Sequence, residues 1–346
     1  MPQHPVPSTP PRVVRQLCFT SQPCRVVTWS PSLTLVPTRA CFNACGYCSF
    51  RRPLELSGAD APSAPALLSD PEALAQLRAS PEAREVLLLS GEVPPDSPAR
   101  GPWFARLLAL SRLALAEGRL PHTNAGPLSR HEMAALGRLN PSMGLMLEGL
   151  GPAVERWHRQ APSKRLELRL GQLEQAGRLG IPFTTGLLLG LGETAAQRRD
   201  ALELIALLQH TWGHIQEVIL QPWRPDGEAA QHLSRAAQQE LLATIAEARA
   251  ILPPEVHLQL PPNLWPLDTL PEALEAGIDD LGGIDSQDVI NPAYPQPGPP
   301  QLQRRLAEAG WQLRPRLCVH GAWIPRLPGP LARRVRDAAQ TLADAC

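Results

Sequence analysis

Lysine is almost missing from this sequence: of its 33 basic residues only Lys164 is a lysine, and the others are arginines. We attribute this imbalance to a coding bias, because alanine, leucine and proline are abundant as well. A surplus of charge is also absent, since 33 acidic residues balance the basic ones. The balance gives no indication of nucleic acid or an anionic membrane as a partner. No apolar run approaches about 18 residues, so no membrane span is expected.

Cysteine is too scarce and too unevenly spaced for a disulfide framework, with seven in 346 residues. The N-terminal residues Met-Pro-Gln-His-Pro are not followed by the basic and apolar regions of a secretory signal. From these two absences we expect a soluble cytoplasmic protein. Proline, in contrast, is abundant: its 40 residues are roughly twice the average usage of about 5%, and they concentrate toward the two ends.

Three of the cysteines, Cys41, Cys45 and Cys48, have the spacing C-x3-C-x2-C within one short stretch. Three thiolates can hold three irons of a 4Fe–4S cluster and leave the fourth iron open for another ligand. A zinc knuckle or three structural thiols are the alternatives. A structural zinc normally takes four ligands as two paired half-sites, and the sequence has no second cysteine pair. We therefore predict a cluster bound by these three cysteines.

An aromatic residue, Tyr47, stands directly before the last cysteine, and the resulting pattern C-x3-C-x-aromatic-C resembles the radical S-adenosylmethionine (SAM) superfamily. The resemblance implies that the amino and carboxylate groups of SAM chelate the open iron. It further implies that one electron from the cluster cleaves SAM into methionine and a deoxyadenosyl radical. Such an enzyme needs an electron donor, for example a flavodoxin or ferredoxin.

Short apolar segments alternate with helical patterns along most of the chain. The predicted strands are 33–36, 86–89, 121–124, 143–147, 181–189, 217–221 and 256–260. The predicted helices are 103–117, one capped by Ser129, 166–179, one opened by Glu193 and Thr194 that reaches 209, and 234–252. Repeated β-α units predict a parallel sheet, either doubly wound or closed. The cluster motif at the end of the first strand favours a TIM-like (β/α) barrel of the radical SAM type.

Three regions are expected. Residues 1–25 are predicted to form a flexible proline-rich arm, and residues 26–260 the barrel core. Residues 261–346 are predicted as a loop-rich C-terminal extension packed on the barrel. In that extension we expect a loop at 277–283 and short helices at 302–309 and 330–345.

Polar residues and glycines at the ends of the predicted strands are candidates for binding SAM. Ser90-Gly91-Glu92 resembles the Gly-Gly-Glu type motif of the superfamily, whose backbone carbonyls accept hydrogen bonds from the methionine ammonium. Glycine there lets the backbone approach closely. The alternative is an ordinary turn after a strand.

Glu148 follows an apolar segment, where a carboxylate is costly unless it faces a polar cavity. It could accept hydrogen bonds from the ribose hydroxyls or the ammonium of SAM. Arg169 could pair with the cofactor carboxylate, or it could be a solvated helical arginine. Gly190 and Gly192 lie in a segment that resembles the part of the superfamily whose main chain packs along the nucleoside.

His122 ends the third predicted strand and is the candidate catalytic residue. It could act as a general base or be a hydrogen-bonded barrel histidine. The sequence does not show which residues handle protons or which substrate atom loses hydrogen.

The whole chain beyond the arm resembles one family, the CofG subunits of FO synthase, where FO is 7,8-didemethyl-8-hydroxy-5-deazariboflavin. The resemblance is carried by 27–31, 36–38, the cysteine motif with Ser49-Phe50, 89–92, 122–129, 142–148, 181–194, 261–266 and 280–284. It implies a radical SAM carbon–nitrogen lyase. A separate CofH-type subunit would join a hydroxybenzyl group to a ribitylamino-uracil, and this chain would close the ring and release ammonium. The alternatives are a radical SAM barrel of the biotin-synthase or aminofutalosine type, or a non-catalytic metal-binding scaffold.

Overall fold

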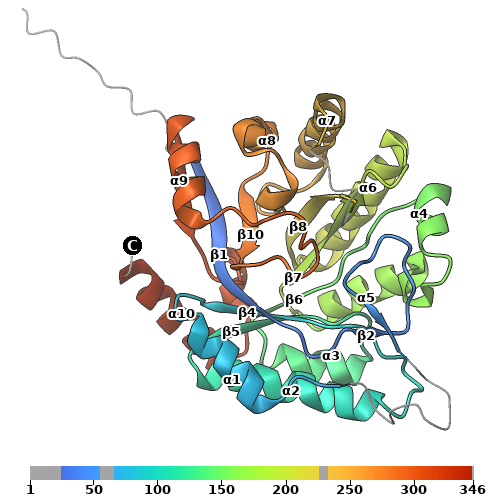
Figure 1. Cartoon of the computed structure of the whole chain (residues 1–346), viewed down its shortest axis with the longest axis vertical. Helices are drawn as coiled ribbons and strands as arrows, with labels where there is room; N and C mark the ends of the chain where they lie inside the picture. The colour runs from blue at the N-terminus through green and yellow to red at the C-terminus, as the bar shows by residue number, and fades with distance from the viewer. Residues whose placement is uncertain (1–24, 55–65, 226–232, 345–346) are drawn as a thin grey trace, which may run out of the picture.

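The structure of the protein is a computed structural model that describes residues 25–54, 66–225 and 233–344. Its centre is a closed barrel of eight parallel strands with helices around it (Figure 1). The barrel strands are β1 (Arg25–Leu35), β4 (Glu85–Leu89), β5 (Leu120–Asn124), β6 (Ser142–Gly144), β7 (Phe183–Leu189), β8 (Ile215–Pro222), β9 (His257–Gln259) and β10 (Asp280–Ile284). The predicted TIM-like (β/α) barrel is confirmed.

Strand β1 is long enough to pair with three other strands. Residues 32–35 pair with β4, and residues 28–31 pair with β10, which closes the barrel. Residues 25–29 pair with β11 (Trp311–Pro315), which extends the sheet beyond the barrel. The predicted strand 33–36 is therefore the last part of a longer one.

The closing strand β10 corrects two expectations. Residues 277–283 were predicted to be a loop because glycines stand at both ends of the segment, yet most of them belong to β10. This strand forms because β1 and β9 on either side supply its hydrogen-bonding partners. It also places part of the segment 261–346 inside the barrel, whereas the barrel core was expected to end at 260. The predicted arm lies, apart from Arg25, outside the described residues.

The other predicted strands are present with small shifts. β6 ends at Gly144 rather than at 147, and Glu148 beyond it makes an isolated bridge with Leu187 of β7. β7 begins at Phe183 rather than at 181, and β9 covers three residues of the predicted 256–260.

The helices that surround the barrel begin where the sequence provides caps. The helices are α1 (Asp70–Ala79), α2 (Arg100–Ala116), α3 (Arg130–Gly137), α4 (Pro152–Trp157), α5 (Leu166–Arg178), α6 (Ala195–Trp212), α7 (Arg235–Ile251), α8 (Leu270–Ala276), α9 (Pro299–Glu308) and α10 (Gly329–Asp344). Ser69, Ser129 and Thr194 form capping boxes at α1, α3 and α6, and Ser234 caps α7. The predicted helices are confirmed, whereas α1, α4, α8 and β11 were not predicted. Within the described residues, none of the helices is both long and apolar enough to cross a membrane.

The segment after β11 covers the barrel end at which the strands begin. Leu317 and Trp323 pack with Leu331 and Val335 of α10 against Leu120, the first residue of β5. The carboxyl ends of the strands therefore lie at the opposite end of the barrel, where barrel enzymes bind their ligands.

Candidate active site

The cysteine loop follows β1 and is held by the main chain of two other loops. Phe42 N donates to Glu92 O over 3.1 Å, and Ala44 N donates to Gln160 O over 2.6 Å. Gly46 N donates to the carbonyl oxygen of Trp157 over 2.8 Å. These bonds tie the loop to the segments that follow β4 and β6, so its position relative to the barrel mouth is defined.

Gly91 allows the cysteine loop to lie close to the end of β4. A Cβ atom on Gly91 would be 2.1 Å from the carbonyl oxygen of Ala40, the residue before Cys41. Gly91 N also donates to Thr38 O over 2.8 Å. The close neighbour of Gly91 in the structure is thus the main chain that leads into the cysteine loop, and its contact with the cofactor stays a prediction.

The thiols of the loop lie in a partly buried environment. Burial, followed by the charge of Glu92, raises the pKa of Cys41. Burial also raises the pKa of Cys45 to about 11, although the positive charge of Lys164 opposes this shift. Within the described ranges no group of three or more His, Cys, Asp or Glu side chains could hold a single metal ion. A 4Fe–4S cluster differs in this respect, because each thiolate binds a different iron.

Glu92 is held by side chains from three parts of the chain. Its Oε2 accepts from Asn43 Nδ2 over 3.0 Å and from Ser163 Oγ over 2.5 Å. Its Oε1 accepts from Arg169 Nη2 over 3.1 Å. Arg169 is almost fully buried and also donates through Nε to the carbonyl oxygen of Ser163 over 2.9 Å. Arg169 is therefore not a solvated helical arginine, and its partner Glu92 was not foreseen.

Glu148 has the only positive φ among the described non-glycine residues, at 78°. Such a backbone conformation is uncommon and occurs at functional sites. Its Oε1 contacts the ammonium of Lys164, and its Oε2 accepts from the Tyr47 hydroxyl over 2.9 Å. Burial acts to raise the pKa of Glu148, but Lys164 and then Arg169 outweigh it and hold the pKa at about 2. The carboxylate is therefore ionised at neutral pH.

A cavity of about 160 Å³ lies beside the cysteine loop. Residues from the loop, from the segment after β6 and from α5 line it, among them Tyr47, Cys48, Glu148 and Arg169. Leu188 and Trp223 form its apolar side. The cavity thus combines a cysteine of the C-x3-C-x2-C motif, a carboxylate, a guanidinium and an apolar wall.

Three of the residues predicted to bind the cofactor, Ser90, Gly190 and Gly192, have structural roles within the protein. The Ser90 hydroxyl accepts from Trp103 Nε1 over 2.9 Å and donates to the carbonyl oxygen of Gly91 over 2.8 Å. Gly190 and Gly192 form the turn after β7 with φ of 95° and 100°, which favours glycine. Glu193 accepts from Gly190 N over 2.7 Å and fixes this turn.

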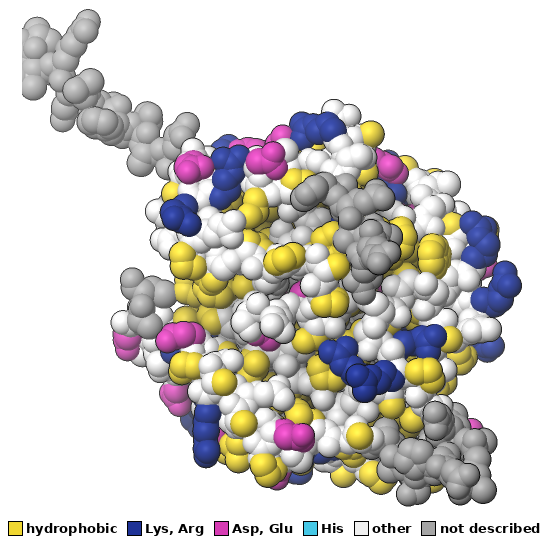
Figure 2. Space-filling model, viewed as in Figure 1, with side chains coloured by type: hydrophobic (Ala, Val, Ile, Leu, Met, Phe, Trp, Pro, Cys, Tyr) yellow, Lys and Arg dark blue, Asp and Glu magenta, His cyan; other side chains and the backbone are white. Residues whose placement is uncertain are grey.

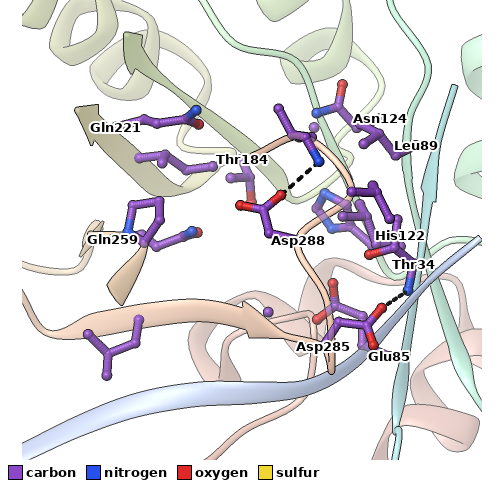
Figure 3. Close-up of a pocket in the computed structure, with 18 of the residues that line it drawn as sticks. Thr34, Glu85, Leu89, His122, Asn124, Thr184, Gln221, Gln259, Asp285 and Asp288 are labelled. Atoms are coloured by element: carbon purple, nitrogen blue, oxygen red, sulfur yellow. Dashed lines mark hydrogen bonds between the residues drawn. The ribbon is translucent and has the colours of Figure 1, made fainter. Parts of the chain in front are cut away.

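A second cavity of about 200 Å³ occupies the barrel interior (Figure 3). Its lining mixes apolar side chains with polar ones, among them the labelled side chains Glu85, His122, Asn124 and Gln221. Asn124, Met146 and Gln221 also line the cavity beside the cysteine loop. The two cavities therefore meet at the carboxyl ends of β5 and β8. Figure 2 shows charged side chains of both signs spread over the face of the molecule that it presents.

The hydrogen bonds of His122 define which ring nitrogen carries its proton. The Ser142 hydroxyl lies 2.7 Å from the Cys318 carbonyl oxygen, which can only accept, so the hydroxyl donates to it. His122 Nδ1 lies 2.7 Å from the same hydroxyl and must therefore be the donor. Burial lowers the pKa of His122 to about 4, so the ring is neutral near pH 7. The remaining Nε2 is an acceptor.

Several residues of the site were not singled out from the sequence. Asn43 and Ser163 lie 120 positions apart and bond to each other and to Glu92. Lys164 was noticed only as the single lysine, and His158, whose Nε2 lies 3.1 Å from the Tyr47 oxygen, was not considered. The rarity of lysine was a usable signal for Lys164, whereas no pattern in the sequence pointed to the others.

Comparison with known proteins gives consistent results. The family model described as "Radical SAM superfamily" matches residues 35–205. A protein of Synechococcus elongatus named 7,8-didemethyl-8-hydroxy-5-deazariboflavin synthase is 50% identical over 318 residues, which cover 91% of this chain and 92% of that protein. A protein of the same name from Gloeobacter violaceus is 51% identical over 319 residues, covering 92% and 95%.

Solved structures show the same fold at low sequence identity. The FeFe-hydrogenase maturase HydG from Carboxydothermus hydrogenoformans has a TM-score of 0.65 and 19% identity, and the match covers 92% of this chain and 79% of that one. Methylornithine synthase (PylB) has a TM-score of 0.58 and 14% identity, covering 84% and 83%. At these identities the likeness concerns the fold alone.

Proposed function

Because this chain belongs to the radical SAM superfamily and, within it, to the 7,8-didemethyl-8-hydroxy-5-deazariboflavin synthases, we propose that it catalyses the ring closure that forms FO. Its substrate would be the hydroxybenzyl adduct of a ribitylimino-uracil that a CofH-type subunit makes. Its products would be FO, ammonium, methionine and deoxyadenosine. The reaction is that of a carbon–nitrogen lyase in the cytoplasm, with an electron donor such as a flavodoxin or ferredoxin.

Membership of the radical SAM superfamily implies a 4Fe–4S cluster and SAM. When bound, the reduced cluster supplies the electron that cleaves SAM into methionine and a deoxyadenosyl radical. Cys41, Cys45 and Cys48 would hold the cluster through their thiolates. The fit is supported by a loop that carries all three sulfurs, is fixed to two other loops, and presents Cys48 to a cavity.

The cavity beside Cys48 would bind SAM. Arg169 would pair with the carboxylate of SAM, and Glu148 would accept hydrogen bonds from its ribose hydroxyls or ammonium. Both side chains line the cavity, and Glu148 is held ionised.

The main chain would complete this site. The carbonyls of Ser90, Gly91 and Glu92 would accept from the ammonium of SAM, and the backbone at Gly190 and Gly192 would lie along the nucleoside. The internal hydrogen bonds of the Ser90, Glu92 and Glu193 side chains support these roles, because they hold the two turns in place.

The barrel interior would bind the substrate, and the observation that carries this proposal is the junction of the two cavities. A radical formed from SAM beside Cys48 would have direct access to a molecule inside the barrel. His122 would be the catalytic residue that contacts this molecule and accepts a hydrogen bond through Nε2. The hydroxyl of Ser142 keeps that nitrogen free of a proton.

The test is an anaerobic reaction of the reconstituted protein with reductant, SAM and the adduct, followed by mass spectrometry. We expect FO, deoxyadenosine, methionine and ammonium. Tyrosine and ribitylamino-uracil without the partner enzyme should give no FO, because a single cluster motif is present for two radical steps. FO from tyrosine with this chain alone would contradict the one-step assignment. Failure on the adduct with an intact cluster would favour another radical SAM reaction, and absence of any SAM cleavage would favour the scaffold alternative.

A further inference from the structure

The interior of this barrel has a charged layer near the beginnings of its strands, where barrels of this type are usually filled by branched apolar side chains. The layer contains the carboxyl groups of Glu85, Glu217 and Asp280, all buried, and the guanidinium of Arg316. Glu85 begins β4 and Asp280 begins β10, while Arg316 enters from the segment after β11. Glu85, Glu217 and Arg316 line the barrel cavity.

Arg316 donates hydrogen bonds to two of the three carboxylates. Its Nε and Nη2 donate to Asp280 over 2.5 and 2.6 Å. Nη2 also donates to the two carboxylate oxygens of Glu217 over 3.3 and 3.2 Å. Glu85 makes no ion pair with any described residue. Three acids thus share one cation, and a buried carboxyl without a paired charge takes up a proton instead of ionising.

The surrounding titratable groups do not supply a second cation. His320 Nε2 lies 3.3 Å from Glu217, but burial holds the pKa of His320 well below its usual value, so it is neutral. Burial acts to lower the pKa of His257, but its hydrogen bond with Asp279 outweighs burial and raises that pKa. The charges of Asp280 and Glu217 also raise it, but among the described residues the ion-pair partner of His257 is Asp279 and not Glu85. The other ionisable groups that line the cavity are His122, Asp285, Asp288 and Cys318, none of which carries a positive charge near pH 7.

We propose that Glu85 is the acid–base residue of the barrel cavity and delivers a proton to the nitrogen that leaves as ammonia. The proposal rests on the proposed function, because the leaving amine belongs to that substrate. Figure 3 shows Glu85 and His122 at the same cavity. His122 orients the substrate through its acceptor nitrogen, and Glu85 transfers the proton.

The pKa values of the two groups support this division of roles. Burial raises the pKa of Glu85 to about 7, although Arg316 acts in the opposite direction. Burial lowers the pKa of His122 to about 4. At neutral pH a carboxyl group with a pKa of about 7 can both give and accept a proton. An imidazole with a pKa of about 4 stays neutral at this pH and only accepts hydrogen bonds through its free nitrogen.

A single carboxyl group can supply the proton needed for ammonia release and then take up the proton that the substrate carbon loses. As the C–N bond breaks, its electron pair goes to nitrogen, which takes the proton of Glu85. As the C=C bond forms, the neighbouring carbon loses a proton, which the Glu85 carboxylate accepts. The net change is the transfer of one proton from carbon to nitrogen, and this elimination consumes no oxidant. Glu85 returns to its starting state.

The test compares Glu85→Gln, Glu85→Asp and the wild type in single-turnover FO formation across about pH 6 to 8. General acid–base catalysis contributes about 10²–10⁴-fold, so Glu85→Gln should slow FO formation by at least about 100-fold. The wild-type rate should fall as pH rises through the pKa of Glu85. This pH dependence should be lost in Glu85→Gln, whereas in Glu85→Asp it should remain with its midpoint shifted along the pH axis. The exposed variant Glu203→Gln is the control and should keep the wild-type profile.

Infrared titration of the reconstituted protein gives an independent result. The C=O stretch of a protonated buried carboxyl should disappear as pH rises through about 7 and should shift in Glu85→Asp. Absence of that band, or an unchanged pH profile in folded Glu85→Gln, would overturn the assignment of Glu85. Wild-type protein that forms no FO would instead overturn the proposed function. If the wild type does form FO, a negative result with the Glu85 variants bears on the assignment of Glu85 alone.

Discussion

Tyr47 donates its phenolic hydrogen to the Oε2 atom of Glu148 across 2.9 Å, and this bond connects the cysteine loop to the segment that follows β6. The aromatic residue of the cysteine motif therefore does more than fill space beside the cluster. It holds one oxygen of a carboxylate whose other oxygen contacts Lys164. Movement of the cysteine loop and movement of Glu148 are coupled through this bond.

Changing Tyr47 to Phe removes the donor while it retains the ring. A buried acceptor left without its partner costs about 1–3 kcal/mol, and about 1.4 kcal/mol corresponds to a factor of ten in affinity. We expect Tyr47→Phe to bind SAM about tenfold more weakly with unchanged iron content, measured by equilibrium dialysis and iron analysis. Wild-type affinity for SAM in this variant would show that Glu148 does not contact the cofactor.

Lys164 is the next test, because its compact ammonium contacts Glu148 in a largely buried place and a guanidinium is larger. Its side chain is 14% exposed and contacts Glu148, and its charge acts on Cys45. Overpacking a filled site costs about 1–3 kcal/mol. We therefore expect Lys164→Arg to weaken SAM binding by roughly tenfold although the charge is retained.

The matched control for Lys164 is Arg199→Lys, the reverse exchange at the protein surface. Arg199 pairs with Glu247, and its side chain is 57% exposed. Surface changes of this kind alter stability by within about 0.5 kcal/mol, so SAM binding should be unchanged. Equal behaviour of the two variants would refute a special role for Lys164.

The cysteine variants test the cluster assignment. Changing Cys41, Cys45 or Cys48 to Ala should abolish SAM cleavage, because each thiolate binds a separate iron. Cys318→Ala should keep iron content near wild type, since the Cys318 thiol lies 4.0 Å from the carbonyl oxygen of Leu120, the first residue of β5, at the opposite end of the barrel. Cys18, Cys24 and Cys346, outside the described residues, should behave like Cys318. A normal cluster in Cys45→Ala would falsify the assignment.

His122 predicts a pH dependence of stability. Its pKa is about 4 in the folded protein and about 6.5 when unfolded, so below pH 6.5 the unfolded chain binds more protons. Stability that is present above pH 6.5 is thus lost as pH falls toward 4. Between pH 7 and pH 5 this histidine should remove about 2 kcal/mol from the free energy of unfolding.

Urea unfolding of wild type and His122→Asn at the two pH values measures this contribution. The loss of stability between pH 7 and pH 5 should be smaller in the variant by about that amount. The comparison uses the difference between two pH values, so a general destabilisation by the substitution cancels. An identical pH dependence in both proteins would mean that His122 is accessible to protons in the folded state.

The parts of this protein that were predictable depend on residues close together in the chain. The cysteine spacing, the strand ends at Glu92 and Glu148, and the caps Ser129 and Thr194 are all local patterns. The hydrogen bonds of a helix cap join residues that are neighbours in the sequence, and side chains alternate in direction along a strand, so the sequence is enough to predict both patterns. The family resemblance in the same segments added the cofactor and the reaction.

Pairings between distant segments were decided only by the tertiary structure. β10 carries a turn-like sequence and becomes a strand because β1, some 250 positions earlier, offers it hydrogen bonds. Lys164 looked like a remnant of coding bias until the fold placed it against Glu148. Burial in the closed barrel raises the pKa of Glu85, and Arg316 beside it is bound by Asp280 and Glu217. A charge is defined by the sequence, but its partners and solvent exposure, which control its energy, arise when the barrel closes.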